Sequence, residues 1–221
     1  EDGQVHARTH LDDPAAFAAS APRIRAMVAS GEAKVGPELL QQLPALEMIS
    51  VFGVGYDGVD VAAARARGVP VTNTPDVLTE EVADLGIALM LSISRRIPQA
   101  DKYVREGKWP GGPFPLTRKV TGARLGIVGL GRIGQAIADR AQAFGMSIAY
   151  TTRTRRDDSP YAYYPSAEAL AREVDFLIVI TPGGETTRGL IDAKVLAALG
   201  SKGYLINVAR GSVVDQPALI H

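Results

Sequence analysis

The stretch that decides the fold is Arg124–Arg153, RLGIVGLGRIGQAIADRAQAFGMSIAYTTR. An apolar, strand-like run leads into Gly129, Gly131 and Gly134 in G-x-G-x-x-G spacing, and a helical pattern then leads to a second strand-like run. A glycine turn between a strand and a helix presents backbone N–H groups and the positive end of the helix dipole to a pyrophosphate. The stretch therefore predicts a βαβ unit that binds a dinucleotide, with a tight structural turn as the alternative.

Each of the three glycines has a separate predicted role. Gly129 permits the tight turn out of the strand, and Gly134 lets the helix pack against the strand. Gly131 lets the backbone approach the pyrophosphate without a Cβ atom in the way.

The end of the second strand indicates which dinucleotide binds. An acidic residue about 20 positions after the first glycine would bind the ribose hydroxyls of NAD, but the sequence has Thr152 and Arg153 there, followed by Arg155 and Arg156. A hydroxyl and guanidinium groups suit a 2′-phosphate. NADP(H) is therefore the predicted preferred cofactor, with NAD(H) possible. Because Asp157–Asp158 follow, some of these arginines could instead only solvate a surface loop.

Composition excludes several classes of function. The 221 residues include 24 Lys+Arg and 24 Asp+Glu, so no overall field attracts nucleic acid or an anionic membrane. The absence of cysteine excludes disulfides and thiolate chemistry, and the three scattered histidines predict no metal site. No signal-like or membrane-spanning run is visible, which predicts a cytoplasmic protein, although Glu1 is not an initiator methionine.

The remaining chain alternates strand and helix patterns, which predicts an α/β fold with parallel sheets. Ile24–Ala29 is predicted as a buried strand, and Thr79–Arg96 as the longest helix, buried between domains because its middle is apolar. Gln99–Trp109 is predicted as an amphipathic helix in an arm that packs on another subunit or within the chain.

Two further positions are candidates for anion binding. The Gly53–Asp57 turn follows a strand directly, and it either offers N–H groups to an anion such as a carboxylate or only needs glycine flexibility. Arg210 follows the apolar strand Tyr204–Val208, where an arginine either faces the ligand crevice or forms a surface ion pair.

Several blocks of the sequence resemble one family in order and in content, the D-isomer-specific 2-hydroxyacid dehydrogenases. The blocks are GVGYDGVD (53–60), VTNTPDVLTEEVADLGIALML (71–91), LGIVGLGRIGQAIA (125–138), TPGGETTRGLID (181–192) and LINVARGSVVD (205–215). Within the family, the Thr152-Arg153 end and the TPGG loop are similar to the NADP-preferring glyoxylate/hydroxypyruvate reductases.

The resemblance implies two doubly wound α/β domains with the active site in the cleft between them. Residues 1–76 would form a partial, flavodoxin-like substrate domain. Residues 77–221 would form a Rossmann domain with a dimerisation arm near 99–117.

The resemblance also implies the roles of individual residues. Arg210 would be the catalytic arginine that binds the substrate carboxylate, together with the backbone at Val54 and Gly55. Cofactor contacts are implied for Gly129, Gly131, Arg132, Ile133, Gly134, Thr152, Arg153, Thr181, Pro182 and Ala209.

The sequence departs from the family pattern at its ends. Family members use a downstream histidine as the acid, oriented by a glutamate, but His221 follows Arg210 too closely for that role. The first family strand is also missing before Glu1, so the sequence resembles a protein incomplete at both ends. By itself the 221-residue chain is therefore expected to be inactive.

The predicted function of the parent protein is NAD(P)H-dependent reduction of glyoxylate or hydroxypyruvate to a D-2-hydroxy acid, by a homodimer. Three alternatives remain: a family dehydrogenase for a bulkier 2-oxo acid, an NAD(H)-sensing, corepressor-like binding protein, and a structural fragment without activity.

Overall fold

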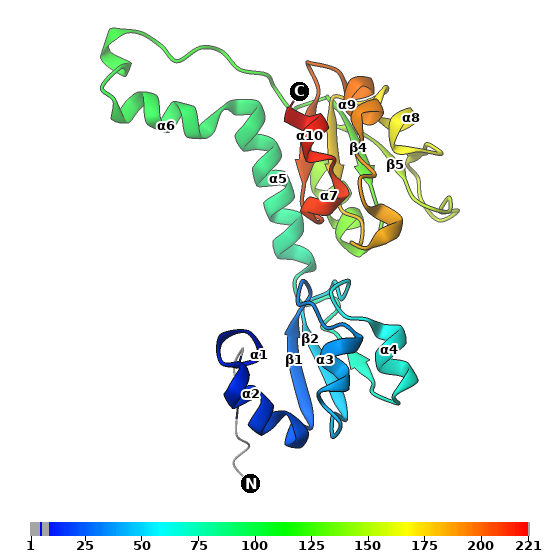
Figure 1. The fold of residues 1–221 in the computed structure, drawn as a ribbon. Coiled ribbons are helices and arrows are strands. Elements are labelled where there is room, and N and C mark those ends of the chain that lie inside the picture. The colour runs from blue at the N-terminus through cyan, green and yellow to red at the C-terminus, as the bar shows by residue number, and fades with distance from the viewer. Residues whose placement is uncertain (1–4, 6–8, 221) are drawn as a thin grey trace. The chain divides into compact units, whose positions relative to one another are not determined.

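The computed structural model describes residues 5 and 9–220, and its chain divides into two compact units, Glu1–Asp76 (unit 1) and Val77–His221 (unit 2) (Figure 1). Both units contain a parallel β-sheet with helices between the strands, so the predicted α/β class is confirmed. Glu1 and His221, on which two of the sequence expectations rest, lie outside the described residues.

Unit 1 contains a three-stranded sheet in the order β1-β2-β3, with both pairs parallel. Its elements are α1 (Thr9–Asp12), α2 (Pro14–Ser20), η1 (Ala21–Arg23), β1 (Ala26–Ser30), α3 (Pro37–Gln41), β2 (Met48–Phe52), α4 (Val61–Ala66) and β3 (Val71–Thr72). Aspartates begin two of the helices, because Asp13 accepts a hydrogen bond from Ala16 N and Asp60 accepts one from Ala63 N.

The sheet of unit 1 is covered on one face. Ile49 and Val51 of β2 are fully buried and belong to one core cluster with Leu40 of the helical layer. Side chains alternate between the faces of a strand, and on the other face Val28 is 78% and Phe52 80% exposed. The prediction of a buried strand at Ile24–Ala29 is therefore wrong for one face of β1. An apolar run in the sequence does not distinguish one-sided from two-sided burial.

Unit 2 contains a five-stranded, fully parallel sheet in the order β6-β5-β4-β7-β8. Its elements are α5 (Thr79–Arg95), α6 (Ile97–Arg105), η2 (Trp109–Gly111), β4 (Arg124–Val128), α7 (Arg132–Gln142), β5 (Ser147–Thr151), β6 (Ala162–Tyr163), α8 (Ala167–Ala171), β7 (Phe176–Val179), η3 (Glu185–Thr187), α9 (Ala193–Leu199), β8 (Tyr204–Asn207), η4 (Gly211–Val213) and α10 (Gln216–Ile220). The strand order reverses between β4 and β7, which makes their carboxyl ends the topological switch point of the sheet.

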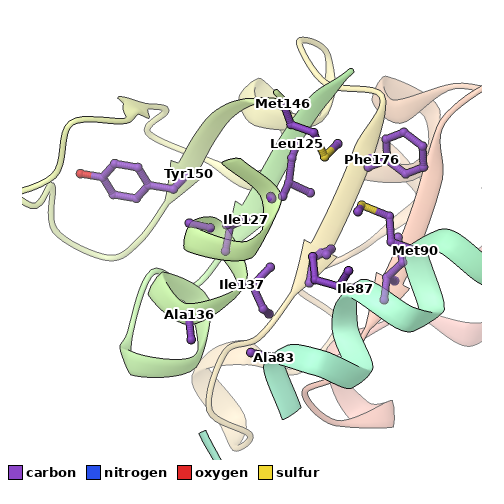
Figure 2. Close-up of a cluster of buried hydrophobic side chains, with 14 of the residues drawn as sticks. Ala83, Ile87, Met90, Leu125, Ile127, Ala136, Ile137, Met146, Tyr150 and Phe176 are labelled. Carbon is purple, nitrogen blue, oxygen red and sulfur yellow. The ribbon is translucent and has the colours of Figure 1, made fainter. Parts of the chain in front are cut away.

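Both faces of the unit 2 sheet are buried. On one face, side chains of α5 and α7 meet those of β4, with Ile87, Leu125 and Ile137 among the residues in contact (Figure 2). On the other face, Val179 and Leu170 belong to a second cluster formed with α8 and α9. Two-sided burial is typical of a doubly wound parallel sheet.

The helix α5 is buried along one face only. Ala83, Ile87 and Met90 point into the core (Figure 2), whereas Leu85 and Leu89 are 52% and 40% exposed. Within unit 2 the apolar middle is therefore buried on one face only, and burial of the second face between domains stays a prediction. No helix in the described part of the chain, α5 included, is long and apolar enough to cross a membrane.

The helices α5 and α6 are separated by Arg96, which adopts a left-handed backbone conformation with φ 52°. Pro98 lies in the first turn of α6 rather than just beyond α5, so α6 begins at Ile97 and not at Gln99 as predicted. Proline is well tolerated there because the first N–H groups of a helix have no intrahelical partner.

Candidate functional site

The glycine turn after β4 is packed tightly against the turn after β7. Gly129 has φ 107°, a conformation that favours glycine, and a Cβ atom there would lie 2.5 Å from the Ile180 carbonyl oxygen. A Cβ atom at Gly134 would lie 2.1 Å from the Gly129 carbonyl oxygen. Both glycines are therefore required by contacts within the chain.

Gly131 differs from the other two glycines. Its φ of −84° is open to any residue, and a Cβ atom there would meet no atom within 4 Å. No contact among the described residues explains a glycine at this position. The space beside its backbone fits a ligand that must approach the chain closely, as a pyrophosphate does.

The amino end of α7 opens onto the same space. Gly131 is the N-cap residue and provides no side-chain cap to this 11-residue helix. The first N–H groups of a helix have no intrahelical partner and suit an anion. Arg132 at the first helical position is exposed, and Ile133 packs partly against the core. The geometry fits the phosphate-binding role that the sequence predicts.

Thr181 lies at the switch point beside this turn. Ile180 N donates to Val128 O at 2.9 Å, and a Cβ atom at Gly129 would lie 3.2 Å from Thr181 N. The Thr181 hydroxyl is buried and has no hydrogen-bond partner among the described residues. An unsatisfied buried hydroxyl costs about 1–3 kcal/mol, so a polar ligand group beside it would be stabilising. Pro182 follows with an exposed ring, and its carbonyl accepts a hydrogen bond from Thr187.

The arginines of the loop after β5 differ in their hydrogen bonds and ion pairs. Arg153 and Arg155 are exposed and form no hydrogen bond or ion pair within the described part of the chain. Arg156 binds Asp158 with two nitrogens, at 3.0 and 2.6 Å, and this side-chain hydrogen bond holds the pKa of Asp158 below its usual value. Arg156 is thus paired with a carboxylate of its own loop, as the surface-loop alternative expects, but its Nη1 also donates to Leu130 O at 2.7 Å, so it does more than solvate the loop. Thr152 is partly buried, and its hydroxyl donates to Thr154 O at 2.6 Å.

Arg210 follows the carboxyl end of β8 in a turn that Asn207 holds. Asn207 Nδ2 donates to Arg210 O at 2.9 Å, and Asn207 Oδ1 accepts from Ala209 N at 3.0 Å. Val208 N continues the sheet by donating to Val179 O. Sequence reasoning missed the role of Asn207, although an asparagine at a strand end is a turn signal.

In unit 1, the turn that contains Val54 and Gly55 is also held by side chains. Asn73 Nδ2 donates to Val54 O at 2.9 Å, and Thr74 Oγ1 accepts from Gly53 N at 3.1 Å. Within the described residues, Val54 N and Gly55 N donate no hydrogen bond. Sequence reasoning treated Asn73 and Thr74 only as the end of a strand, and so missed that they brace this turn.

Several of the predicted residues thus lie along one edge of the unit 2 sheet. The glycine turn, Thr181, the loop after β5 and Arg210 all follow carboxyl ends of its strands, whereas Val54 and Gly55 belong to unit 1. Among residues 9–220, no group of three or more histidine, aspartate or glutamate side chains could hold a metal ion.

A parallel sheet of this strand order, with a glycine turn and an uncapped helix at its switch point, defines a dinucleotide-binding domain. The chain belongs to the D-isomer specific 2-hydroxyacid dehydrogenase family, because residues 87–221 match the model of that family's NAD binding domain.

The relatives of the chain include enzymes and solved structures of this family. Glyoxylate/hydroxypyruvate reductase A HPR2 of Arabidopsis thaliana is 50% identical over 197 residues, which are 89% of this chain and 63% of the relative. Hydroxyphenylpyruvate reductase of Plectranthus scutellarioides is 49% identical over 204 residues, 92% of this chain and 65% of the relative. The chain therefore spans slightly less than two thirds of the length of these relatives.

A solved structure is similar to this chain over most of its length. NADPH-dependent glyoxylate/hydroxypyruvate reductase of Sinorhizobium meliloti, in complex with NADP and malonate, is 50% identical with a TM-score of 0.87. The match covers 91% of this chain and 63% of that protein.

Proposed function

We propose that the full-length protein reduces a small 2-oxo acid to the D-2-hydroxy acid with NADPH. The observation that carries this proposal is the placement of Arg210 at the same edge of the sheet as the glycine turn. Unit 2 would bind the dinucleotide, and unit 1 would contribute substrate-binding groups. The reduced nicotinamide, when bound, supplies the hydride to the carbonyl carbon.

Arg210 would bind the substrate carboxylate and polarise the neighbouring carbonyl. A guanidinium has a forked set of donors that fixes a carboxylate in one orientation. Asn207 forms hydrogen bonds with the backbone of Arg210 and Ala209 and so holds the turn in place. Less conformational entropy is therefore lost when substrate binds. In unit 1, the N–H groups of Val54 and Gly55 would also bind a carboxylate.

The dinucleotide would lie along the glycine turn. The pyrophosphate would contact Gly131 and the first N–H groups of α7, at Arg132 and Ile133. Thr181 and Pro182 would flank the cofactor. The buried Thr181 hydroxyl, which has no hydrogen-bond partner in the part of the chain that the structure describes, supports this placement. Ala209 would lie near the nicotinamide.

The preference for NADPH over NADH rests on the loop after β5. Thr152 stands where an NAD-binding domain has an acidic residue, and Arg153 and Arg155 carry positive charge with no carboxylate bound to it in the described residues. A 2′-phosphate would gain charge-assisted hydrogen bonds there. The NADPH-dependent relative from Sinorhizobium meliloti supports this preference.

Glyoxylate and hydroxypyruvate are the proposed substrates because the names of two similar relatives contain both acids. A bulkier 2-oxo acid is the second candidate, since hydroxyphenylpyruvate reductase is nearly as similar. Pocket contacts discriminate a single methylene by only about 1–3 kcal/mol, so both candidates belong in the same assay.

A homodimer is proposed from the surface of α5 and of the arm near 99–117. Leu85, Leu89 and Ile93 form an exposed apolar stripe at helical spacing, and Trp109 is exposed on the arm. The arm is braced internally, because Tyr103 donates to Gly112 O and packs edge-on against Phe114. A braced arm with outward apolar side chains suits a second copy of the chain.

A cytoplasmic location remains a prediction of the sequence.

The test is cofactor oxidation by the purified full-length protein, with glyoxylate, hydroxypyruvate and hydroxyphenylpyruvate, each with NADPH and with NADH. We expect turnover with at least one acid and a preference for NADPH. Arg210→Ala should lower kcat/KM by about 10²–10³-fold, the cost of losing one charge-stabilising donor. The matched control is Arg172→Ala, an exposed arginine paired with Glu168 on α8.

Three outcomes would overturn parts of the proposal. A preference for NADH would remove the role of the arginine loop but leave the reaction class. Full activity of Arg210→Ala would remove the role of Arg210. Cofactor binding without turnover of any 2-oxo acid would instead favour a protein that senses NAD(H) for a partner.

A further inference from the structure

The loop after β5, residues 152–158, is connected to the glycine turn by one side chain. From this connection, and on the basis of the proposed function, we infer that Arg156 is a positioning residue for the dinucleotide, whereas Arg153 and Arg155 recognise the 2′-phosphate. Arg156 would fix the position of the 152–158 loop relative to the glycine turn, and both segments would line the adenosine half of the cofactor. It would thereby serve NADH and NADPH alike.

The guanidinium of Arg156 bridges two segments that are 26 positions apart. Its Nη1 donates to Leu130 O at 2.7 Å, in the middle of the Gly129-Leu130-Gly131 turn. Its Nε and Nη2 donate to the two carboxylate oxygens of Asp158 at 3.0 and 2.6 Å. The Asp158 carboxylate thus orients the guanidinium of Arg156, and the remaining nitrogen, Nη1, connects the loop to the glycine turn.

The backbone of Arg156 is anchored as well. Arg156 N donates to the hydroxyl of Tyr150 at 2.9 Å, and that hydroxyl donates to Arg156 O at 3.2 Å. Tyr150 is almost fully buried in β5, and its ring packs against Tyr163 with centroids 5.5 Å apart. Arg156 is therefore held from the core side by the hydroxyl and from the turn side by its own guanidinium.

These bonds make Arg156 unsuited to bind the 2′-phosphate. The Nε–Nη2 edge, which forms bidentate bonds with a phosphate, is occupied by Asp158. A phosphate at that edge would have to displace the carboxylate and remain beside its negative charge. Arg153 and Arg155 have no such competitor among the described residues.

The two roles predict different dependence on the cofactor. Leu130 O belongs to the turn that both cofactors contact through their shared pyrophosphate, so loosening it weakens NADH and NADPH equally. Arg153 and Arg155 contact only the group that NADH lacks. Their removal should therefore weaken NADPH alone.

The experiment is calorimetric titration of the full-length protein with NADPH and with NADH, without substrate. Arg153→Ala and Arg155→Ala should each raise the Kd for NADPH by about tenfold, the size of one charge-assisted hydrogen bond, and leave the Kd for NADH within about twofold. Arg156→Ala should raise both Kd values by a similar factor, about five- to tenfold. Arg172→Ala, the paired surface arginine, serves as the control and should change neither.

Two further variants separate positioning from charge and from unfolding. Arg156→Lys keeps the charge but loses the fork, so it should still weaken both cofactors and leave their ratio unchanged. Tyr150→Phe keeps the buried ring and removes only the hydroxyl that anchors Arg156, so it should give the same pattern with a smaller factor. The melting temperature of each cofactor-free variant shows whether the fold is intact.

The inference and the proposed function fail in different ways. Loss of NADPH affinity alone in Arg156→Ala would make Arg156 a phosphate ligand. Unchanged Kd values for both cofactors in Arg156→Ala or Tyr150→Phe would remove the positioning role. A wild-type protein that binds neither cofactor would instead overturn the proposed function.

Discussion

The two sheets of this protein differ in how many of their faces are covered. In unit 2, helices bury both faces of the sheet, and β7 is buried along its whole length. In unit 1, Ile49 and Val51 are buried on one face, while Val28 and Phe52 stand exposed on the other. Parallel sheets usually have both faces covered. Tolerance to substitution should therefore depend on the face in unit 1 and should be low on both faces in unit 2.

The largest expected effect comes from replacing one phenylalanine in each sheet. Phe176→Ala should destabilise unit 2 by about 3–5 kcal/mol, because Phe176 is fully buried and stacked on Tyr204. Phe52→Ala should change stability by less than about 0.5 kcal/mol, because Phe52 is exposed. Hydrogen exchange, measured separately for the amides of unit 1 and of unit 2, gives the change in stability that each variant causes. A large cost of Phe52→Ala would show that the open face of unit 1 is covered in the protein in solution.

The next effect concerns the tight packing around the glycine turn of unit 2. Gly134→Ala places a Cβ atom 2.1 Å from the Gly129 carbonyl oxygen, so α7 must shift, at a cost of about 3 kcal/mol. The Cβ atom of Gly131→Ala would meet no atom of the described residues within 4 Å, so this variant should leave the fold intact but weaken dinucleotide binding. Denaturant unfolding and cofactor titration separate the two effects. Equal stability of the two variants would contradict the packing that we describe.

A smaller effect distinguishes a half-buried ion pair in unit 2 from an exposed one in unit 1. Asp175 is 20% exposed and accepts hydrogen bonds from Arg118 and Arg124. The side-chain hydrogen bond from Arg124 lowers the pKa of Asp175 below its usual value. We expect Asp175→Asn to destabilise unit 2 by about 2 kcal/mol at neutral pH.

The pH dependence of this effect follows from the direction of the shift. A carboxyl group with a lowered folded-state pKa contributes its stability above its unfolded pKa of about 3.9 and loses it as pH falls through the folded value. Asp175→Asn should therefore remove part of the acid-induced loss of stability in unit 2. Glu47→Gln in unit 1 is the comparison, because the Arg25–Glu47 pair is largely exposed and screened by water. If Asp175→Asn left the acid-induced loss of stability of unit 2 unchanged, this assignment would be wrong.

The smallest effect should be the same in both units, because helix caps are local. Asp60 caps α4 of unit 1 through Ala63 N, and Asp192 caps α9 of unit 2 through Lys194 N and Val195 N. Asp60→Ala and Asp192→Ala should each cost about 1 kcal/mol, and the corresponding asparagine variants should restore most of it. Thermal unfolding of the four variants tests this. A clear difference between the units would show that capping depends on the tertiary environment.

The sequence predicted much of the fold, because many of its signals are local. The patterns of neighbouring residues predicted both the alternation of strands and helices and the turn at Gly129. The buried face of α5 was only half predicted, since an apolar helix does not show which side meets a sheet. The roles of Arg210, Val54 and Gly55 remain predictions. Their bracing by Asn207, Asn73 and Thr74 was not predicted, because a single asparagine or threonine at a strand end is a weak signal.

By itself, the sequence determined the glycine spacing and the order of strands and helices, because steric limits on the backbone act over a few residues. Only the tertiary structure decided which arginine of the 152–158 loop is engaged. The carbonyl that Arg156 binds belongs to Leu130, 26 positions earlier in the chain, and only the pairing of β4 with β5 brings the two together. The tertiary structure likewise decided which apolar faces are buried. Burial depends on the segment that packs opposite, and no local pattern contains that segment.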